Sequence, residues 1–292
     1  MTHLVLWGHR IRDGANTLAY VWEGYAKAAR RLGLDVVQVD DAPASAPAVQ
    51  PGAIVFAEGQ EDKHLPRLPG VTYVLHNCDW TAYHDQRPRC LALQVYTHDC
   101  LDRTVETLAP FVYYQRVGGC LGILYQPWAT DLLPEEFRPE DIIAARIPRA
   151  GWVGTVGEGR FGNVPQLAGF RNACAEHGMP FEIRQTMPAA DARVFLRDSQ
   201  LAPTIVGAWQ QEKGYLPCRA WKNASYGHPV LTNSLAVVEA MGGFGHYAAD
   251  TAKLFHLGVD GIPKVEILAG MRYVQAHHTF VNRLTTILKV IA

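Results

Sequence analysis

The sequence has no uninterrupted apolar segment close to the roughly 20 residues that a membrane-spanning helix requires. Its net charge is −1, so no overall field attracts nucleic acid or acidic lipid, although a local basic groove stays possible. The six cysteines show no CxxC spacing, which favours reduced thiols over disulfides or a zinc site. The N-terminal MTHLVLWGHR lacks a signal-peptide core. We therefore expect a cytoplasmic protein without a membrane span.

Metal-binding carboxylate motifs are also missing, since no D-x-D or other carboxylate cluster stands at a suitable strand end. Nothing in the sequence therefore calls for a divalent metal ion or an organic cofactor. His9, His76 and His98 do follow three predicted strands. A metal site built from them is disfavoured, because no supporting second set of ligands accompanies them.

What is present is the composition of a globular protein with a real core. Of the 292 residues, 48% are hydrophobic and 19% are charged, and the length suits two domains. Short apolar segments alternate with amphipathic ones, which predicts two successive α/β halves with doubly wound parallel sheets. In the first half we expect strands at 3–7, 34–39, 53–57, 71–75, 91–96 and 122–125, and helices at 17–32 and 100–111.

A charged, proline-containing connection at 133–148 separates the two halves, and the α/β pattern then begins again. In the second half we expect strands at 150–155, 180–184, 204–208 and 230–232. Helices are expected at 164–177, 189–198, from Pro217 to Gly227, and at 235–241, 248–255, 264–268 and 277–291. Open α/β sheets bind ligands beyond the carboxyl ends of their strands, so the residues that follow strands are the candidates for a site.

The segment Lys213–Ser234 contains a helix that begins at Pro217 and carries two cations, Arg219 and Lys222, three residues apart. Cations near a helix N-terminus are unfavourable unless an anion is held there, which indicates a phosphate-bearing ligand. A solvated basic face explains the same two residues. Tyr215, directly before the cations, is a candidate for stacking on a base or a sugar ring, and Trp209 and Trp152 are further candidates.

A second motif, Gly157-x-Gly-x-x-Gly, follows the predicted strand at 150–155 and precedes a helix. Glu182 lies 20 residues after Gly162, so the segment fits the dinucleotide-binding pattern in outline. Arg160 within the loop suits a phosphate. The same glycines are also compatible with a tight turn that serves only strand–helix packing.

These motifs together resemble a known family. The segment Arg219–Thr232 resembles the R-x-F-E-x-x-x-x-G-x-x-x-x-T pattern of GT-B glycosyltransferases, nearest to the CgeB-like branch of the family-1-type enzymes. His278–Arg283 is similar to their closing H-T-[YF]-x-x-R helix, and Gln126–Asp131 is similar to their P-x-G-x-D segment. Trp152–Thr155 resembles the start of their donor domain. The matches cover about residues 124–292.

The resemblance implies two Rossmann-like domains that face one cleft, with the C-terminal helix able to pack back on the N-terminal domain. It implies an acceptor domain at 1–145 and a nucleotide-sugar domain at 146–292. The implied reaction is metal-independent transfer of a hexose or pentose, with the leaving diphosphate stabilised by a helix N-terminus and basic residues. The expected donor-binding residues are Gly154, Gly157, Arg160, Glu182, Tyr215, Leu216, Pro217, Arg219, Lys222 and Asn223.

One residue departs from the family pattern. Lys222 occupies the position of a glutamate that usually binds the ribose. Glu212 or Glu239 could replace that carboxylate, or Lys222 could add a phosphate contact for a different donor.

An inverting reaction would need a base in the first half. We expect His9, His76 and Asp99 as catalytic residues, with Asp13, Glu58, Asp79 and His98 as further candidates. Histidine suits the role because its unperturbed pKa of about 6.5 lies near the working pH. A retaining reaction would leave these residues to position the acceptor.

Two other functions remain open. An NAD(P)-dependent oxidoreductase could use the Gly157–Gly162 loop with Glu182, and a non-catalytic protein could bind a nucleotide or a sugar. For the transferase, the acceptor stays open among saccharides, lipids, proteins, small molecules and modified nucleic-acid bases.

Overall fold

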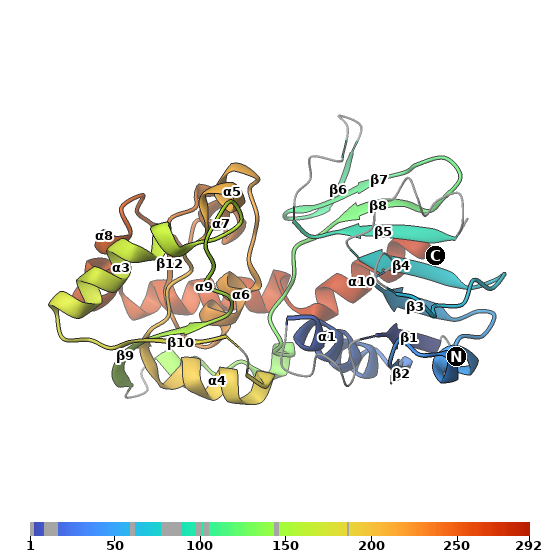
Figure 1. Cartoon of the computed structure of the whole chain (residues 1–292), viewed down its shortest axis with the longest axis horizontal. Coiled ribbons are helices and arrows are strands. Elements are labelled where there is room, and N and C mark those ends of the chain that lie inside the picture. The colour runs from blue at the N-terminus through green and yellow to red at the C-terminus, as the bar shows by residue number, and fades with distance from the viewer. Residues whose placement is uncertain are drawn as a thin grey trace. The chain divides into compact units, whose positions relative to one another are not determined.

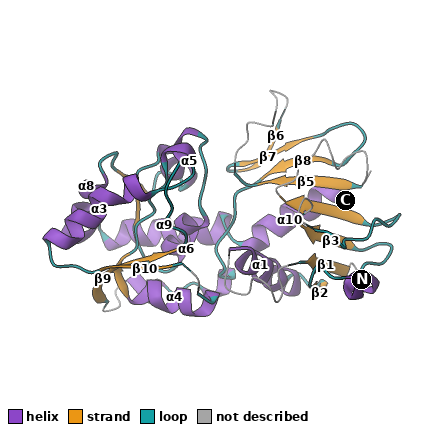
Figure 2. Cartoon of the chain, in the orientation of Figure 1, coloured by secondary structure: helices purple, strands orange, loops and turns teal. Residues whose placement is uncertain are grey.

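The computed structural model describes residues 3–8, 17–58, 62–76, 89–96, 101, 105–142, 146–185 and 187–292. The chain forms two compact units, and each contains a sheet with accompanying helices (Figures 1 and 2). The first unit comprises Met1–Asp131 and Phe280–Ala292, and the second comprises Leu132–Thr279. The sequence suggested a division after residue 145, whereas the compact units divide at Asp131.

The first unit is built on an eight-stranded sheet with the order β2-β1-β3-β4-β5-β8-β7-β6. Strands from β2 to β8 run parallel, while β7 and β6 continue the sheet antiparallel. The order reverses at β1, with β2 on one side and β3 on the other, as in doubly wound folds. The strands are β1 (His3–Trp7), β2 (Asp35–Val39), β3 (Ile54–Ala57), β4 (Thr72–His76), β5 (Cys90–Gln94), β6 (Glu106–Ala109), β7 (Val112–Gln115) and β8 (Gly122–Tyr125).

Two helices from opposite ends of the sequence pack together within the first unit. They are α1 (Thr17–Arg31) and α10 (Phe280–Ile291). Phe280 makes edge contacts with the rings of Tyr20 and Tyr25, at centroid distances of 5.8 and 4.9 Å. A Cβ on Gly24 would lie 2.2 Å from the Phe280 ring, so α1 needs glycine at this position. The prediction that the C-terminal helix packs on the N-terminal domain is confirmed.

A buried arginine also fixes α10 to the first unit. Arg283 on α10 is 2% exposed, and it donates to the carbonyls of Pro127, at 2.7 Å, and Trp128, at 3.3 Å. Its burial lowers the arginine pKa to about 10, so the group stays charged at neutral pH. α10 thereby holds the segment that follows β8.

The second unit contains a parallel sheet β10-β9-β11 and a parallel pair β12-β13. A parallel bridge between Thr204 and Thr232 continues the pairing from the segment after β11 to β12. The strands are β9 (Ile147–Val153), β10 (Phe181–Arg184), β11 (Ser199–Leu201), β12 (Val230–Thr232) and β13 (Gly245–Tyr247). The helices are α3 (Val164–Glu176), α4 (Ala189–Asp198), α5 (Ala208–Glu212), α6 (Cys218–Ser225), α7 (Leu235–Ala240), α8 (Thr251–Asp260) and α9 (Lys264–His277).

Short 3₁₀ helices lie at η1 (Pro43–Ala48), η2 (Pro134–Glu136) and η3 (Pro139–Ile142).

The doubly wound α/β fold class is confirmed. Large apolar side chains fill the core of the second unit between β9, α3 and α8, including Trp152, Phe170 and Phe255.

The helix expected at 100–111 is wrong for the described residues of that segment. Glu106–Ala109 and Val112–Gln115 form the β6–β7 hairpin instead. Phe111 in its turn has a φ of +56°, which no helix accommodates. Pairing of β7 with β8 buries Val112, so tertiary pairing overrides the local helical pattern.

Two boundaries in the second unit also differ from expectation. The strand predicted at 204–208 lies earlier in the chain, at Ser199–Leu201. Within 204–208, Thr204 forms a β-bridge and Ala208 already begins α5. The helix predicted at 264–268 extends to His277, and the terminal helix begins at Phe280 rather than at 277. A break at His278, with φ −128° and ψ 40°, separates the two helices. The chain passes from the second unit to the first at this break, because His278 is buried in the second unit and Phe280 in the first.

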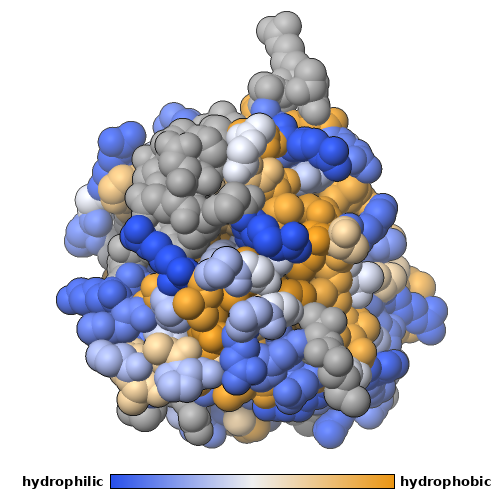
Figure 3. Space-filling view, turned by 90° about the vertical axis from the view of Figure 1, so that its right-hand side faces the viewer, coloured by the Kyte–Doolittle hydropathy of each residue, from blue (hydrophilic) through white to orange (hydrophobic). Residues whose placement is uncertain are grey.

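No helix among the described segments is long and apolar enough to cross a membrane. On the face that Figure 3 presents, an orange area of apolar residues is bordered by blue hydrophilic ones.

We predict that Gly24→Ala destabilises the protein by about 1–3 kcal/mol, because the new methyl group overlaps the Phe280 ring. Urea-induced unfolding measures the effect. Glu23→Ala is the control, since Glu23 is exposed on the same helix and its change should stay within about 0.5 kcal/mol. A Gly24→Ala variant as stable as the parent would contradict the close packing of α1 on α10.

Candidate functional site

The carboxyl end of β9 meets the first turn of α6 at Arg219. The Arg219 guanidinium lies over the Trp152 ring, 3.5 Å from the ring centroid. Its Nε and Nη2 atoms donate to the carbonyl of Val153 at 3.4 and 3.2 Å. Burial lowers the pKa of Arg219 to about 10, so the cation persists at neutral pH. The structure therefore holds a positive charge in a fixed place at the end of a parallel strand.

Gly154 makes room for this arginine. Its φ is +128°, and a Cβ at this position would lie 2.6 Å from Arg219 Nη2. A side chain at residue 154 would thus meet both a strained backbone and the guanidinium. Gly154 and Arg219, both expected to bind the donor, are brought together here.

The loop that follows is held by its own backbone and one buried side chain. Asn163, at the start of α3, accepts from Gly157 N and donates to the Thr155 carbonyl, both at 3.2 Å. Gly162 packs on the Gly157 carbonyl so closely that its Cβ would lie 2.1 Å from that oxygen. The tight turn expected for this motif is present, and its backbone conformation is well defined.

The start of α6 has no side-chain cap. Pro217 is the N-cap residue and offers no side-chain hydrogen bond to the first turn. Uncapped N–H groups at a helix start favour an anion. Leu216 beside it is buried in the core, and Tyr215 lies close enough to Arg219 to raise the arginine pKa.

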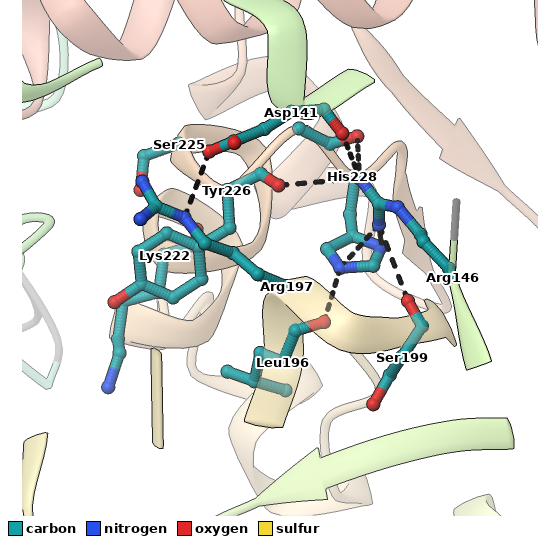
Figure 4. A network of polar contacts seen from close by, with 10 residues as sticks. Asp141, Arg146, Leu196, Arg197, Ser199, Lys222, Ser225, Tyr226 and His228 are labelled. Atoms are coloured by element: carbon teal, nitrogen blue, oxygen red, sulfur yellow. Dashed lines mark hydrogen bonds and ion pairs between the residues drawn. The ribbon is translucent and has the colours of Figure 1, made fainter. Parts of the chain in front are cut away.

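Further along α6, two expected donor residues lie in the interior. Asn223 donates to the Ala202 carbonyl at 2.7 Å and to Thr204 Oγ1 at 3.3 Å, which ties α6 to the segment after β11. Lys222 is 9% exposed. In Figure 4 its ammonium group points away from the ion pair of Asp141 and Arg197.

Two other expected donor-binding residues, Glu182 and Arg160, contact groups other than Arg219. Glu182 on β10 forms ion pairs with Arg184, at 3.1 Å, and with Arg149, at 3.9 Å. Arg160 is exposed, and its guanidinium lies 5.5 Å from the Phe161 ring centroid.

In the first unit, His76 closes β4 and is 1% exposed. Its ring lies 4.4 Å from the ring of Trp128, which follows β8, and 6.4 Å from that of Tyr96, which follows β5. Glu58, after β3, is 9% exposed. His9, Asp13, Asp79, His98 and Asp99 lie outside the described residues. Among the residues that the structure does describe, no group of three or more His, Cys, Asp or Glu side chains could hold a metal ion.

A separate polar network connects α4, α6, η3 and β9 in the second unit (Figure 4). The Arg146 guanidinium donates to the carbonyls of Asp141, at 2.8 Å, and Gly227, at 2.9 Å. Its Nη1 also lies against the ring of His228. His228 Nε2 donates to the Leu196 carbonyl at 2.8 Å, which leaves Nδ1 without a proton and facing the cation. The sequence contains no signal for this network, because its partners are distant in the chain.

Sequence analysis also did not single out Phe161 or Asn233. Asn233 accepts from Val206 N at 2.9 Å and donates to the Val206 carbonyl at 3.0 Å. It thereby fixes the segment before α5 next to β12. An aromatic residue inside a glycine-rich loop is the only sequence signal that could have identified Phe161.

Comparisons with known proteins place this geometry in a fold family. No protein-family model matches the chain, and no curated protein sequence matches it. Among solved structures, it is similar to AviGT4, a glycosyltransferase involved in avilamycin A biosynthesis, with a TM-score of 0.62 and 12% identity over 100% of this chain and 97% of that one.

An alpha-glucosyltransferase in complex with UDP and a 13-mer DNA containing an HMU base has a TM-score of 0.65 and 9% identity, over 99% of both chains. The same enzyme with UDP-glucose and DNA containing an abasic site gives 0.63 and 9%, over 99% of both. These neighbours are GT-B glycosyltransferases, and the chain has their fold. At such low identity the likeness establishes the fold alone.

The Figure 4 network predicts a stability that falls in acid. Burial, followed by the charge of Arg146, holds the pKa of His228 well below its ordinary value of 6.5. The folded protein keeps His228 neutral while the unfolded chain takes up a proton. Stability should therefore drop by about 1.4 kcal/mol for each pH unit below about 6.5, until the folded pKa is reached. Urea unfolding at pH 7.5, 6.5 and 5.5 measures this loss.

His228→Gln should be less stable than the parent at pH 7.5 but should lose less stability between pH 6.5 and 5.5. His256→Gln is the control, since His256 is exposed on α8 and its variant should keep the parent's pH dependence. An unchanged pH dependence in His228→Gln would show that another group is responsible.

Proposed function

We propose that this protein is a glycosyltransferase that moves a hexose or pentose from a nucleotide-sugar donor to an acceptor. The observation that carries the proposal is the charged Arg219, held between Trp152 and the Val153 carbonyl at the carboxyl end of β9. Ligands of open α/β sheets bind at this end of the strands. A fixed cation beside a glycine and an uncapped helix start suits a diphosphate.

The fold neighbours support the same chemistry. The alpha-glucosyltransferase structures contain UDP or UDP-glucose, and AviGT4 is a glycosyltransferase. In our proposal the donor diphosphate lies between Gly154 and the first turn of α6. The N–H groups of that turn and the Arg219 guanidinium stabilise the charge that develops as the glycosidic bond breaks. These N–H groups and the guanidinium can take the place of a metal ion, so the proposed reaction is metal-independent.

We further propose that the donor occupies the 146–292 portion, and that the acceptor occupies the 1–145 portion, of a cytoplasmic enzyme of the CgeB-like branch. His76, His9 and Asp99 are the proposed catalytic residues. His76 is supported by its place at the end of β4, where its ring packs on Trp128. An imidazole held in this way suits a base that takes the acceptor's proton in an inverting reaction.

Ribose recognition would differ from the family pattern in this proposal. Lys222 stands where the pattern has a glutamate, and Glu212 and Glu239 are both exposed. Glu212 directly precedes the segment that leads to Tyr215 and α6, so it is our choice for a carboxylate that contacts the ribose.

An NAD(P)-dependent oxidoreductase is less well supported by the contacts. Its ribose would need Glu182, which is already paired with Arg184 and Arg149. Thermal-shift measurements with UDP, GDP, TDP and NADH separate the two functions, because a ligand that binds the folded state raises its stability. Stabilisation by NADH alone would favour the oxidoreductase.

We predict that Arg219→Ala binds the preferred nucleoside diphosphate about 10- to 100-fold more weakly than the parent. The reason is the loss of charge-assisted hydrogen bonds worth roughly 1.5–3 kcal/mol. Isothermal titration calorimetry gives the affinity, and thermal unfolding verifies that each variant is folded. Arg184→Ala is the matched control, because this arginine lies on the same unit and its side chain is 50% exposed.

His9→Ala should retain the parent's nucleotide affinity, since we place His9 on the acceptor side. Equal affinities of Arg219→Ala and the parent would overturn the assignment of α6 as the diphosphate site.

A further inference from the structure

Two exposed histidines lie together on the surface of the second unit, apart from the proposed diphosphate site. His177 is the C-cap residue of α3, and His256 belongs to α8, which packs beside α3 (Figure 1). Their ring centroids are 5.1 Å apart, with planes at 73°. Imidazole is a common ligand of transition-metal ions, so two neighbouring histidines from different helices are a candidate metal site.

The His177 ring is held in the tautomer that a metal ligand needs. Its Nδ1 lies 2.9 Å from the Ala173 carbonyl oxygen, one turn earlier on α3. Because a carbonyl oxygen can only accept, Nδ1 carries the proton, and Nε2 of the neutral ring keeps its lone pair. Histidines that bind metal ions usually donate their other ring N–H in this way, which fixes the ring and makes the binding nitrogen more basic.

Both histidine rings also rest on the same buried side chain. The Phe255 ring, which is 1% exposed, has its centroid 4.9 Å from that of His177 and 5.5 Å from that of His256. Phe255 in turn contacts Phe170 of α3, 5.9 Å away between centroids. The imidazoles therefore have a rigid support, and less conformational freedom is lost when they bind an ion.

The separation of the two rings decides between coordination geometries. With a metal–nitrogen distance of about 2.1 Å, each ring centroid lies about 3.2 Å from the ion. Two imidazoles at the tetrahedral angle then have centroids about 5.2 Å apart, whereas two at a right angle, as in square-planar or octahedral sites, are about 4.5 Å apart. The observed 5.1 Å agrees with the tetrahedral value. Zn²⁺ is the ion that most often adopts this geometry with histidine ligands.

We propose that His177 and His256 bind a Zn²⁺ ion on the surface between α3 and α8. Among the described residues no group of three His, Cys, Asp or Glu side chains could hold a metal ion, so water molecules fill the other positions of this one. α3 begins at Val164, beside the glycine loop, and ends at His177, so the ion lies about 20 Å from that loop. The ion links two helices and stabilises the fold, and it takes no part in the proposed transfer.

The test uses the full chain after dialysis against EDTA, with ZnCl₂ as the probe. Isothermal titration calorimetry should show binding of one ion per chain. At a free Zn²⁺ concentration about tenfold above the Kd, the Tm of the parent should rise by about 3–6 °C, because only the folded state brings the two imidazoles together. His177→Gln and His256→Gln should each lose this rise and bind Zn²⁺ at least about tenfold more weakly.

His64→Gln is the matched control, because His64 is also an exposed histidine but lies in the first unit. This variant should keep the parent's Zn²⁺ affinity and its rise in Tm. In long-range ¹H–¹⁵N NMR spectra of the parent, Zn²⁺ should shift the Nε2 resonance of His177 and leave Nδ1 protonated.

Any of three results refutes the site: no Zn²⁺ binding by the parent, equal Zn²⁺ affinity of the parent and either variant of the pair, or an equal loss in His64→Gln. Nucleoside diphosphate affinity should be the same in the parent and in His177→Gln and His256→Gln. The zinc site and the proposed transferase can therefore each fail without the other.

Discussion

The guanidinium of Arg219 constrains the residues around it at the end of β9. A cation taken out of water must be compensated by hydrogen bonds or by other polar contacts. Here the Val153 carbonyl and the face of Trp152 supply part of that compensation. Both partners come from the end of β9, so the charge is fixed relative to the sheet. Gly154 is then required, because any larger residue would occupy the place of the guanidinium.

Helix α6 joins this cation to the rest of its unit. Asn223 ties its middle to the Ala202 carbonyl, and Trp221 stacks on His278 at 3.9 Å with nearly parallel planes. Gly227, with φ +79°, ends the helical segment where a Cβ would meet the backbone of Asp141. The same short helix thus contacts the sheet, the C-terminal end of the unit and η3. These contacts along α6 hold its first turn in place, and a binding site for a small anionic ligand requires such a fixed position.

The sequence was sufficient where local pattern and tertiary environment agree. Buried parallel strands such as β1 and β3 read as continuous apolar segments, and Arg219 stood out as a cation at a helix start. It was insufficient where long-range pairing decides, as in the β6–β7 hairpin, whose residues also fit a helix until β8 pairs with them. The ion pairs of Glu182 and the ring contact of Phe161 depend on partners from other elements. No spacing along the chain encodes such contacts.

The position of α10 has a consequence for how the chain matures. The second unit is continuous in sequence, from Leu132 to Thr279, whereas the first needs Phe280–Ala292 to complete it. The first unit therefore cannot be completed by one continuous segment. Packing of α10 on α1 closes a loop of about 150 residues, from Asp131 to Phe280, that contains the whole second unit. Contacts between segments so distant in sequence form slowly, so we expect this packing to be a late step in folding.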